Sequence, residues 1–303
     1  MTRPVLVIGL ACLAISSCKP AAPSAGGERP LALREMSREQ RHIFLKGYAG
    51  DWRGETDRSK GIPAPAIEKP FPPDARLIPL ARPDPTRIGT MPLAQTINQR
   101  RSRRSYTAEA LTIEELSFLL WSTQGIAGTD KAPNGRIVNQ FRTVPSGGAR
   151  HPFETYLAVN RVAGVEPGLY RYLPVEHQLL RIGDAIPPAV LAAACYGQEH
   201  AGRAAVLFIW SAIPYRTEWA YDYVAPKLIA IDAGHVCENL YLAAEAIGAG
   251  ACAILGYHQQ KLDKLIQVDG IEEFAFYLAS VGKVGGEDPT TAQETEPRSQ
   301  EGP

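Results

Sequence analysis

The chain has 303 residues, of which 45% are hydrophobic and 21% are charged. This composition is ordinary for a globular protein and allows one large domain or two small ones. Its 32 basic and 32 acidic side chains give a formal net charge of zero at pH 7. Because nucleic-acid binding requires an excess of Lys and Arg along one face, we expect no nucleic-acid partner.

The first 18 residues have the pattern of a bacterial lipoprotein signal. Arg3 supplies a positive charge, and residues 5–15 form an apolar run that is too short to span a bilayer. The run leads into the sequence ISSC at residues 15–18, which resembles the site where such a signal is removed and the cysteine lipidated. We therefore expect a signal peptide over residues 1–17, lipidation at Cys18, and attachment to the periplasmic face of a bacterial cell envelope. The alternative is an ordinary cleaved signal peptide with a chance cysteine.

Two segments flank the expected main domain. Residues 18–85 contain eleven of the chain's 25 prolines, with Ala, Gly and Ser between them. Since proline fixes its own φ and biases the preceding residue toward extended conformations, this segment is expected to be a tether and an irregular arm. One short helix is expected over residues 37–48, and the part from residue 50 onward can wrap over the main domain. Residues 286–303 are almost free of apolar side chains, so we expect a disordered tail.

Residues 86–285 form a domain that is large enough for one substantial core. Thr112 and Glu115 make a capping box, which predicts a helix from residue 113 that Gly125 closes. Further helices are expected at 228–247 and 258–266, and strands at 155–160, 204–211, 251–255 and 274–281, with a hairpin over 168–182. Because helices alternate with strands while a hairpin is present, the pattern indicates an α+β or mixed α/β fold.

Three cysteines lie in this domain, at Cys195, Cys237 and Cys252. They show no CxxC spacing and no paired histidine, so we expect neither a metal site nor a disulfide framework, and interpret them as small apolar core residues. The sequence also lacks Gly-x-Gly-x-x-Gly and a recognisable Ser/His/Asp arrangement. A Rossmann nucleotide domain and a hydrolase are therefore not supported.

The densest charge in the chain is Arg100-Arg101-Ser102-Arg103-Arg104. Guanidinium groups bind phosphate through paired hydrogen bonds, and the Ser102 hydroxyl adds a further donor. A phosphate site is one interpretation of this cluster. The other is a solvated basic turn.

The sequence around this cluster resembles the FMN-dependent nitroreductase family, and more narrowly its branch of azoline dehydrogenases that form thiazole and oxazole peptides (SagB/ThcOx-like). The resemblance begins with RRSRRSY at residues 100–106. Three further blocks follow in the family's order: PSGGARHP at 145–152, GLYRY at 168–172, and IDAGH at 231–235, which matches the start of the long central helix. Together the blocks cover about residues 86 to 284.

The resemblance implies a fold and a set of flavin-binding residues. The fold is α+β, with a mixed, mainly antiparallel sheet flanked by helices, and the family forms homodimers with FMN at the subunit interface. The residues that match the family's site are Arg100 and Ser102, with Arg101 alongside, for the phosphate; Arg104 for the pyrimidine edge; Pro145, Ser146, Gly147 and Gly148 for a loop against the ring; Gly256 for the amide that faces N5; and Lys283 near a second phosphate-binding position. Lys283 is equally consistent with a charge at a strand end.

By the same resemblance, the chain is a ping-pong oxidoreductase in which one substrate passes a hydride to FMN and another takes electrons from it. A quinone or nitroaromatic compound is the expected acceptor, and NAD(P)H is not the expected donor outside the cytoplasm, where a quinol or a reduced partner protein would serve. In the azoline branch a Lys-Tyr pair precedes the central helix. That pair falls here on Ala220-Tyr221, so Tyr221 is the matched catalytic residue and the lysine base is missing, with Lys227 as the only nearby substitute.

Two alternatives stay open. One is a flavin-free binding or structural lipoprotein on the same scaffold, and the other is an azoline-type dehydrogenase that acts on a modified peptide. His235 is interpreted as a hydrogen-bonding residue at the start of the long helix, and Asp232 as an N-terminal or buried structural acid. Trp121 and Trp219 are interpreted as packing residues.

Overall fold

The computed structural model describes residues 55–131, 133–134 and 137–285, together with Ser37, Arg38, His42, Leu45 and Lys46. The chain divides into two compact units, residues 1–46 and 47–303, and the second contains the domain described below. The expected signal peptide, Cys18, the tail and most of the expected helix over 37–48 lie outside the described residues. Within the described residues, no helix is both long enough and apolar enough to cross a membrane.

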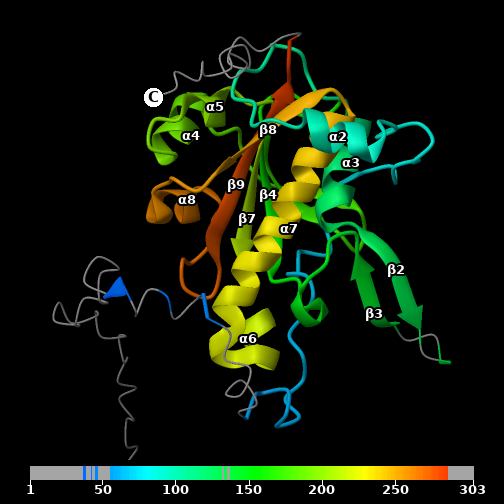
Figure 1. Ribbon diagram of the computed structural model, residues 1–303, viewed down its shortest axis with the longest axis vertical. Helices are drawn as coiled ribbons and strands as arrows, with labels where there is room; N and C mark the ends of the chain where they lie inside the picture. Colours follow the sequence, from blue (N-terminus) through cyan, green and yellow to red (C-terminus); the bar gives the residue numbers. More distant parts are fainter. Residues whose placement is uncertain are drawn as a thin grey trace, which may run out of the picture. The chain divides into compact units, whose positions relative to one another are not determined.

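A seven-stranded sheet forms the centre of this domain (Figure 1). Its strands are β1 (Leu77–Pro79), β4 (Phe153–Val159), β5 (Gly168–Leu173), β6 (Gln178–Gly183), β7 (Val206–Ala212), β8 (Ala249–Ile254) and β9 (Phe274–Lys283). They lie in the order β1-β6-β5-β4-β7-β9-β8, and each neighbouring pair is antiparallel. The predicted α+β fold with a mainly antiparallel sheet is confirmed.

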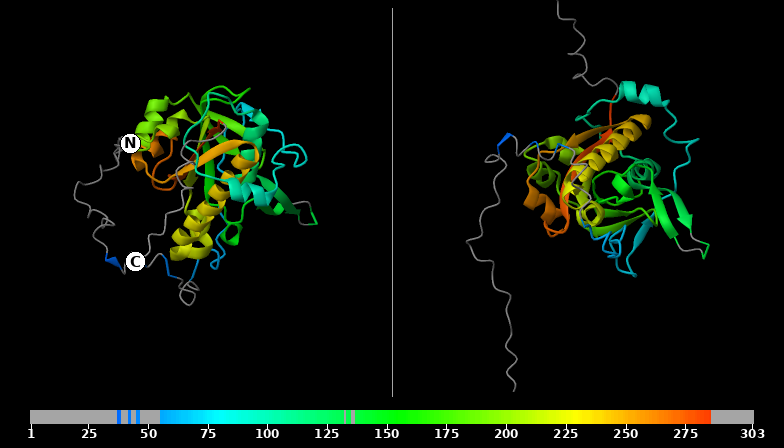
Figure 2. Two further views of the ribbon diagram at one scale, coloured as in Figure 1. Left: turned by 45° about the horizontal axis from the view of Figure 1, so that its top comes forward. Right: turned by 60° about the horizontal axis from the view of Figure 1, so that its bottom comes forward.

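Helices cover both faces of the sheet, in the three-layer arrangement visible in Figures 1 and 2. The helices α3 (Ile113–Gln124) and α7 (Ala225–Ala246) pack on one face, and α4 (Pro188–Ala194), α5 (Glu199–Arg203) and α8 (Gln259–Leu265) pack on the other. Strand β7 explains the layers: Phe208 and Trp210 point toward α3 and α7, whereas Leu207 and Ile209 point toward the second group. Because both faces of β7 are buried, its sequence is a continuous apolar run, which is why it was predicted as a strand.

The predicted helix from residue 113 to Gly125 is confirmed at both ends. The Thr112 hydroxyl accepts a hydrogen bond from the Glu115 backbone N–H at 3.1 Å, and a Glu115 carboxylate oxygen accepts from the Thr112 N–H at 2.9 Å. The other Glu115 oxygen pairs with the ammonium of Lys283, at the end of β9. One side chain therefore caps α3 and joins it to the last strand.

The long helix α7 begins earlier than the sequence indicated. We expected a helix over residues 228–247, but it begins at Ala225, with Pro226 in its first turn. Proline fits the first turn of a helix because that position needs no N–H donor, so Pro226 extends the helix rather than ending it. The expectation that His235 stands at the helix start is therefore wrong, whereas Asp232 is the buried acid that was one of its two expected roles. Both lie in the helix interior, Asp232 buried and His235 exposed.

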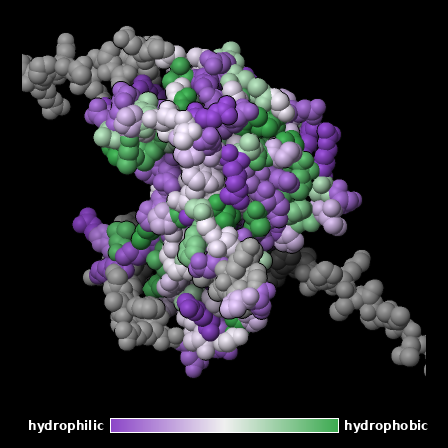
Figure 3. All heavy atoms as spheres, turned by 90° about the vertical axis from the view of Figure 1, so that its right-hand side faces the viewer, coloured by the Kyte–Doolittle hydropathy of each residue, from purple (hydrophilic) through white to green (hydrophobic). Residues whose placement is uncertain are grey.

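Several short elements were not predicted from the sequence. They are the helices α2 (Leu93–Gln99), α4, α5 and α6 (Tyr215–Tyr221), the 3-10 turns η1 (Gly147–Ala149) and η2 (Asp222–Val224), and the separate two-stranded hairpin of β2 (Ile126–Lys131) and β3 (Ile137–Arg142). The hairpin extends from one side of the domain in Figure 1. On the face seen in Figure 3, hydrophilic and hydrophobic residues are interspersed.

The arm from residue 55 onward lies on this domain and is held by charged side chains. β1 pairs with β6, and the guanidinium of Arg171 donates to the carbonyls of Lys69 and Pro70 at 3.0 and 3.1 Å. The Lys69 N–H donates to the carboxylate of Glu154 at 2.9 Å, and the Lys69 ammonium pairs with Glu273. These contacts tie the arm into the polar part of the core.

Candidate functional site

The arginine cluster runs as an extended segment along β8. Ser102 forms a parallel bridge with Ala251, and the Arg103 N–H donates to the Ala251 carbonyl at 2.9 Å. Arg103 packs flat on Gly250, where an added Cβ would lie only 2.5 Å from the Cβ of Arg103. Ser102 is exposed and Arg100 is half-buried. Alternate side chains of an extended segment share a face, which places Arg100, Ser102 and Arg104 on the same side.

Tyr241 of α7 contacts both predicted phosphate ligands, and the sequence analysis did not identify it. Its hydroxyl lies 3.0 Å from the Ser102 hydroxyl and accepts a hydrogen bond from the Ala253 N–H at 2.8 Å. The guanidinium carbon of Arg100 lies 5.3 Å from the centre of its ring. The available signal was a phenol in a largely apolar helix, since a buried tyrosine hydroxyl usually has a partner.

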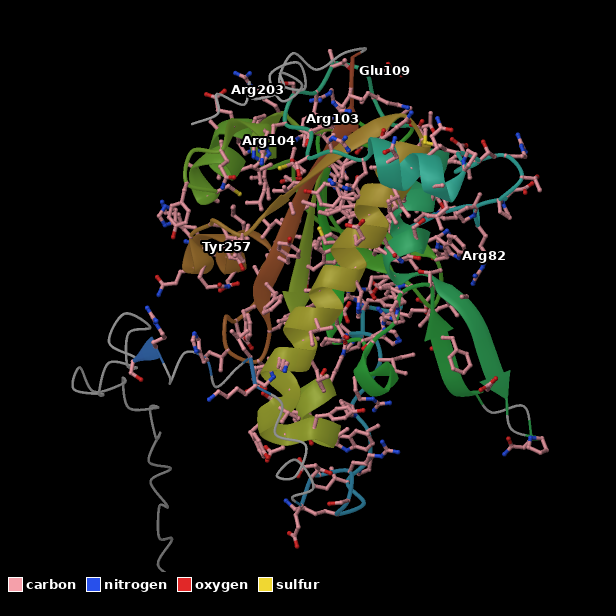
Figure 4. All side chains as sticks on the ribbon, in the orientation of Figure 1. Arg82, Arg103, Arg104, Glu109, Arg203 and Tyr257 are labelled. Atoms are coloured by element: carbon pink, nitrogen blue, oxygen red, sulfur yellow. The ribbon has the colours of Figure 1, made fainter. Side chains whose placement is uncertain are left out.

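The other predicted cations have different surroundings. The Arg101 guanidinium donates to the carbonyls of Asn98 and Arg100 at 2.9 and 2.8 Å, at the C-terminal end of α2. The Lys283 ammonium forms its ion pair with Glu115. Arg104 lies between α5 and β8 (Figure 4), where burial raises the pKa of the Cys252 thiol and Arg104 opposes that rise. Arg101 and Lys283 thus have partners within the chain, and Arg104 lies beside the Cys252 thiol.

A buried carboxylate shapes the glycine-rich loop that follows Pro145. Asp232 accepts a hydrogen bond from the Ser146 hydroxyl at 2.5 Å and from the Gly147 N–H at 3.1 Å. Burial raises the pKa of Asp232, and these two hydrogen bonds oppose the rise. The Ser146 hydroxyl also accepts from the His151 N–H at 2.9 Å, which closes the loop. Asp232 is therefore a structural acid that fixes the loop on α7.

Tyr221, at the end of α6, lies against this loop. Gly148 has a φ of 59°, and a Cβ at this position would collide with the Tyr221 hydroxyl. A glycine is needed there for both its backbone conformation and its closeness to the phenol. Ala220, in the place of the azoline branch's lysine, is buried. The structure thus brings the predicted catalytic tyrosine to the predicted flavin loop.

Trp219 joins α6 to the N-terminal arm and to the same loop. Its indole N–H donates to the Ile62 carbonyl at 2.8 Å, and its own carbonyl accepts from the Arg58 N–H at 2.9 Å. The guanidinium carbons of Arg58 and Arg150 lie 5.9 and 5.1 Å from the centre of the Trp219 ring. Arg150 also donates to the Gly148 carbonyl at 2.9 Å. Trp219 is a packing residue, as expected, and it packs three segments around Tyr221.

Gly256 follows β8 in an exposed turn. The Gln198 side-chain amide donates to the Gly256 carbonyl at 2.8 Å, and the next residue, Tyr257, donates to the carbonyls of Ala275 and Phe276 at 3.0 and 2.9 Å. Tyr257 is labelled in Figure 4 beside α8. These bonds hold the turn, and nothing comes closer than 3.4 Å to a Cβ added at Gly256.

The predicted residues form two groups at different places along α7. Arg100 and Ser102 lie at Tyr241, whereas the loop with Gly147 and Gly148 lies at Asp232, nine residues earlier and about 13 Å away at 1.5 Å per helical residue. A groove of about 950 Å³ between β1 and β6 contains none of them. Among the described residues, no group of His, Cys, Asp or Glu could hold a metal ion. The predicted residues of one chain thus form two separate groups, a half-site at Tyr241 and a half-site at Asp232.

Comparison with known proteins agrees with these features. A sequence model described as "Nitroreductase family" matches residues 97–283. A protein of Methanocaldococcus jannaschii that is named as a nitroreductase is 32% identical over 196 residues, which cover 65% of this chain and 93% of that protein. The trifolitoxin-processing protein TfxB of Rhizobium leguminosarum bv. trifolii is 27% identical over 139 residues, which cover 44% of this chain and 37% of that protein.

Among solved structures, one from Anabaena variabilis whose name includes nitroreductase is 25% identical, with a TM-score of 0.58. The match covers 70% of this chain and 42% of that chain. The chain therefore spans less than half of the length of this structure and of the trifolitoxin-processing protein, but nearly all of the Methanocaldococcus protein.

Proposed function

The chain belongs to the nitroreductase family, and on that premise we propose that it is an FMN-dependent oxidoreductase that reduces a small-molecule acceptor, such as a quinone or a nitroaromatic compound. The observation that carries the proposal is the pairing of Arg100 and Ser102 at β8. Both side chains lie on Tyr241, and Ser102 is exposed. A guanidinium beside a hydroxyl donor is a donor set suited to a phosphate monoester.

The residues present fit FMN by the chemistry of these donors. Arg100 and Ser102 would hold the phosphate, and Arg104, farther along the same face, would lie near the polar edge of the ring system. Gly147 and Gly148 lack side chains, which allows a flat ring to approach the loop backbone closely. Gly256 has room for the same reason. When bound, FMN would supply the two-electron transfer, which the protein side chains cannot provide.

The remaining residues would hold the loop and α6 in position rather than take part in the reaction. Asp232 holds the loop through Ser146 and Gly147, and Trp219 holds α6 so that the Tyr221 hydroxyl stays at Gly148. From there the Tyr221 phenol can donate a hydrogen bond to a substrate bound at the loop. By the resemblance to the family, we propose a homodimer in which each cofactor lies between the arginine segment of one chain and the glycine loop of its partner. Exposed apolar side chains of α2 and α7, including Leu93, Ile97 and Ile231, support such an interface.

The test begins with the isolated protein. Flavin released from it by denaturation should be FMN, identified by its mass, and the apoprotein should bind FMN more tightly than riboflavin. Chemically reduced protein should be reoxidised by quinones or nitroaromatic compounds in stopped-flow absorbance. A protein that binds no flavin under any of these conditions would contradict the proposal and favour the flavin-free binding lipoprotein instead.

The likeness to the trifolitoxin-processing protein favours a second candidate, an azoline-type dehydrogenase acting on a modified peptide. Ala220 argues against it, because it is buried and carries no base to accept the proton lost during aromatisation. General base catalysis typically contributes about 10²–10⁴-fold. A thiazoline peptide should therefore fail to bleach the oxidised flavin. Bleaching at a rate comparable to reoxidation by quinone would support this second candidate.

A further inference from the structure

Tyr241 makes three contacts that together constrain its hydroxyl group. The Ala253 backbone N–H points at its oxygen from 2.8 Å, and the Ser102 hydroxyl lies 3.0 Å away. The Cys252 thiol also lies close enough to interact with it. A backbone N–H can only donate, so the Tyr241 oxygen is an acceptor toward Ala253. The Tyr241 O–H has one proton left to donate, and the direction of the hydrogen bond to Ser102 depends on which acceptor takes that proton.

The Tyr241 proton has two available acceptors, and they differ in strength. A thiol sulfur is a weak acceptor, whereas a serine hydroxyl oxygen is a good one. The favourable arrangement is therefore a chain in which the Ala253 N–H donates to Tyr241 and the Tyr241 O–H donates to Ser102. Burial raises the pKa of the Tyr241 phenol, so it keeps its proton at neutral pH.

This direction decides what Ser102 can do. Once its oxygen accepts from Tyr241, its own proton must point away from Tyr241, and the exposed side chain directs it outward from β8. Arg100 lies two residues earlier on the same face, with its guanidinium over the Tyr241 ring. One phenol thus orients both donors, the hydroxyl through its O–H and the guanidinium through its ring.

We propose that Tyr241 is a positioning residue that presents Arg100 and Ser102 as outward-facing donors to the phosphate of a flavin mononucleotide. The inference rests on the proposed FMN function and adds a residue from α7 to it. Tyr241 itself touches no ligand. Its oxygen accepts from Ala253, its proton is donated to Ser102, and its ring is covered by Arg100.

The test separates the two halves of the side chain. Tyr241→Phe keeps the ring under Arg100 and removes the hydrogen bond to Ser102, so the affinity for FMN should fall about three- to tenfold, the range of one lost hydrogen bond. Tyr241→Leu removes both contacts and should lower the affinity further, toward that of Arg100→Ala. Affinities are measured by quenching of flavin fluorescence, and riboflavin, which lacks the phosphate, should bind each variant almost as it binds the wild-type protein. Tyr170→Phe, which loses a hydroxyl bonded to the Glu166 carbonyl away from the cluster, is the matched control.

A double-variant cycle distinguishes positioning from packing. Because Tyr241 acts through Ser102, Tyr241→Phe should cost little once Ser102→Ala is present. Additive losses, or equal losses for FMN and riboflavin, would mean that Tyr241 only packs α7 against β8. If Arg100→Ala and Ser102→Ala abolish the preference for FMN while Tyr241→Phe leaves it intact, this inference is wrong and the proposed function stands. If the wild-type protein shows no preference for FMN, the proposed function is wrong as well.

Discussion

Arg100 lies at the boundary between protein and solvent, half-buried over the Tyr241 ring. If it holds a phosphate there, its replacement removes a charge-assisted contact worth about 1.5–3 kcal/mol. Arg100→Ala should therefore weaken FMN binding roughly ten- to hundredfold, while riboflavin binding changes little. Arg203→Ala, which removes an exposed arginine paired with Glu199, controls for the change in net charge. Equal losses for the two flavins on titration would exclude the phosphate contact.

Glu68 is the residue of the arm whose ionisation is most strongly affected by the fold. Burial raises its pKa to about 7, against a hydrogen bond from the Val175 N–H that lowers it. Because the folded pKa exceeds the unfolded value, Glu68 contributes stability that is fully present below the unfolded pKa and is lost as the pH rises through about 7. The melting temperature of the wild-type protein should therefore fall between about pH 5 and pH 8, relative to that of Glu68→Gln at the same pH.

The comparison between the wild-type protein and Glu68→Gln isolates the contribution of Glu68. Burial lowers the pKa of His151 to about 3, so neutral His151 contributes stability above the unfolded pKa that is lost as the pH falls, which is the opposite direction. His151 is present in both proteins, so its contribution cancels in the difference. Glu114→Gln, at an exposed position on α3, is the matched control. If the melting temperatures of the wild-type protein and Glu68→Gln change with pH in parallel across this range, burial does not destabilise the ionised form of Glu68.

At the scale of the element, α6 depends on the arm that crosses it. Trp219→Phe keeps an aromatic ring between Arg58 and Arg150 but removes the indole hydrogen bond to the Ile62 carbonyl. A loosened α6 should lower kcat about three- to tenfold, on the scale of one hydrogen bond, and leave the affinity for FMN unchanged. Hydrogen–deuterium exchange should rise in residues 55–62 and in α6. Trp121→Phe on α3 provides the control, and unaltered exchange in α6 would contradict a positioning role for the arm.

Elements with strong local signals were predicted correctly, and those that depend on distant contacts were not. The capping box of Thr112 and Glu115 specifies α3 by itself, and the apolar run of β7 requires burial on both faces. In contrast, α6 has seven residues and is held by Asp57, Arg58 and Ile62 of the arm, more than 150 positions away in the chain. No periodicity within such a short segment predicts it. The contact between Ser102 and Tyr241 spans 139 positions, so local sequence reasoning predicted a role for Ser102 and missed the residue behind it.

At the scale of the whole molecule, the two half-sites on α7 predict complementation between defective chains. Arg100→Ala damages the half-site that is proposed to bind the phosphate. Gly148→Val damages the loop by placing a side chain against Tyr221. Each variant alone should lose most of its acceptor reductase activity. In heterodimers formed by co-expression, one of the two sites would combine the intact half of each chain, so up to half of the activity of a wild-type dimer should return. Failure of isolated heterodimers to recover activity would place the whole site within one chain.

The N-terminal signal makes a separate prediction about location. We propose that Cys18 is lipidated and anchors the protein to the periplasmic face of the cell envelope. Cys18→Ser should release the protein from the membrane fraction or leave its precursor uncleaved, and it should abolish incorporation of labelled fatty acid. Cys12→Ser, within the same apolar run, serves as the control. Unchanged fractionation and labelling of Cys18→Ser would exclude the anchor.

β9, the last strand of the described chain, lies between β7 and β8 rather than at an edge of the sheet. Synthesis delivers the chain from its N-terminus, so every other strand of this sheet becomes available before β9. Until residues 274–283 emerge, β7 has an unpaired edge and β8 has no strand beside it, because β9 joins the two. During synthesis, β7 and β8 therefore cannot be joined into one sheet before β9 is available. The order of the strands thus delays completion of the seven-stranded sheet until residues 274–283 have been synthesised.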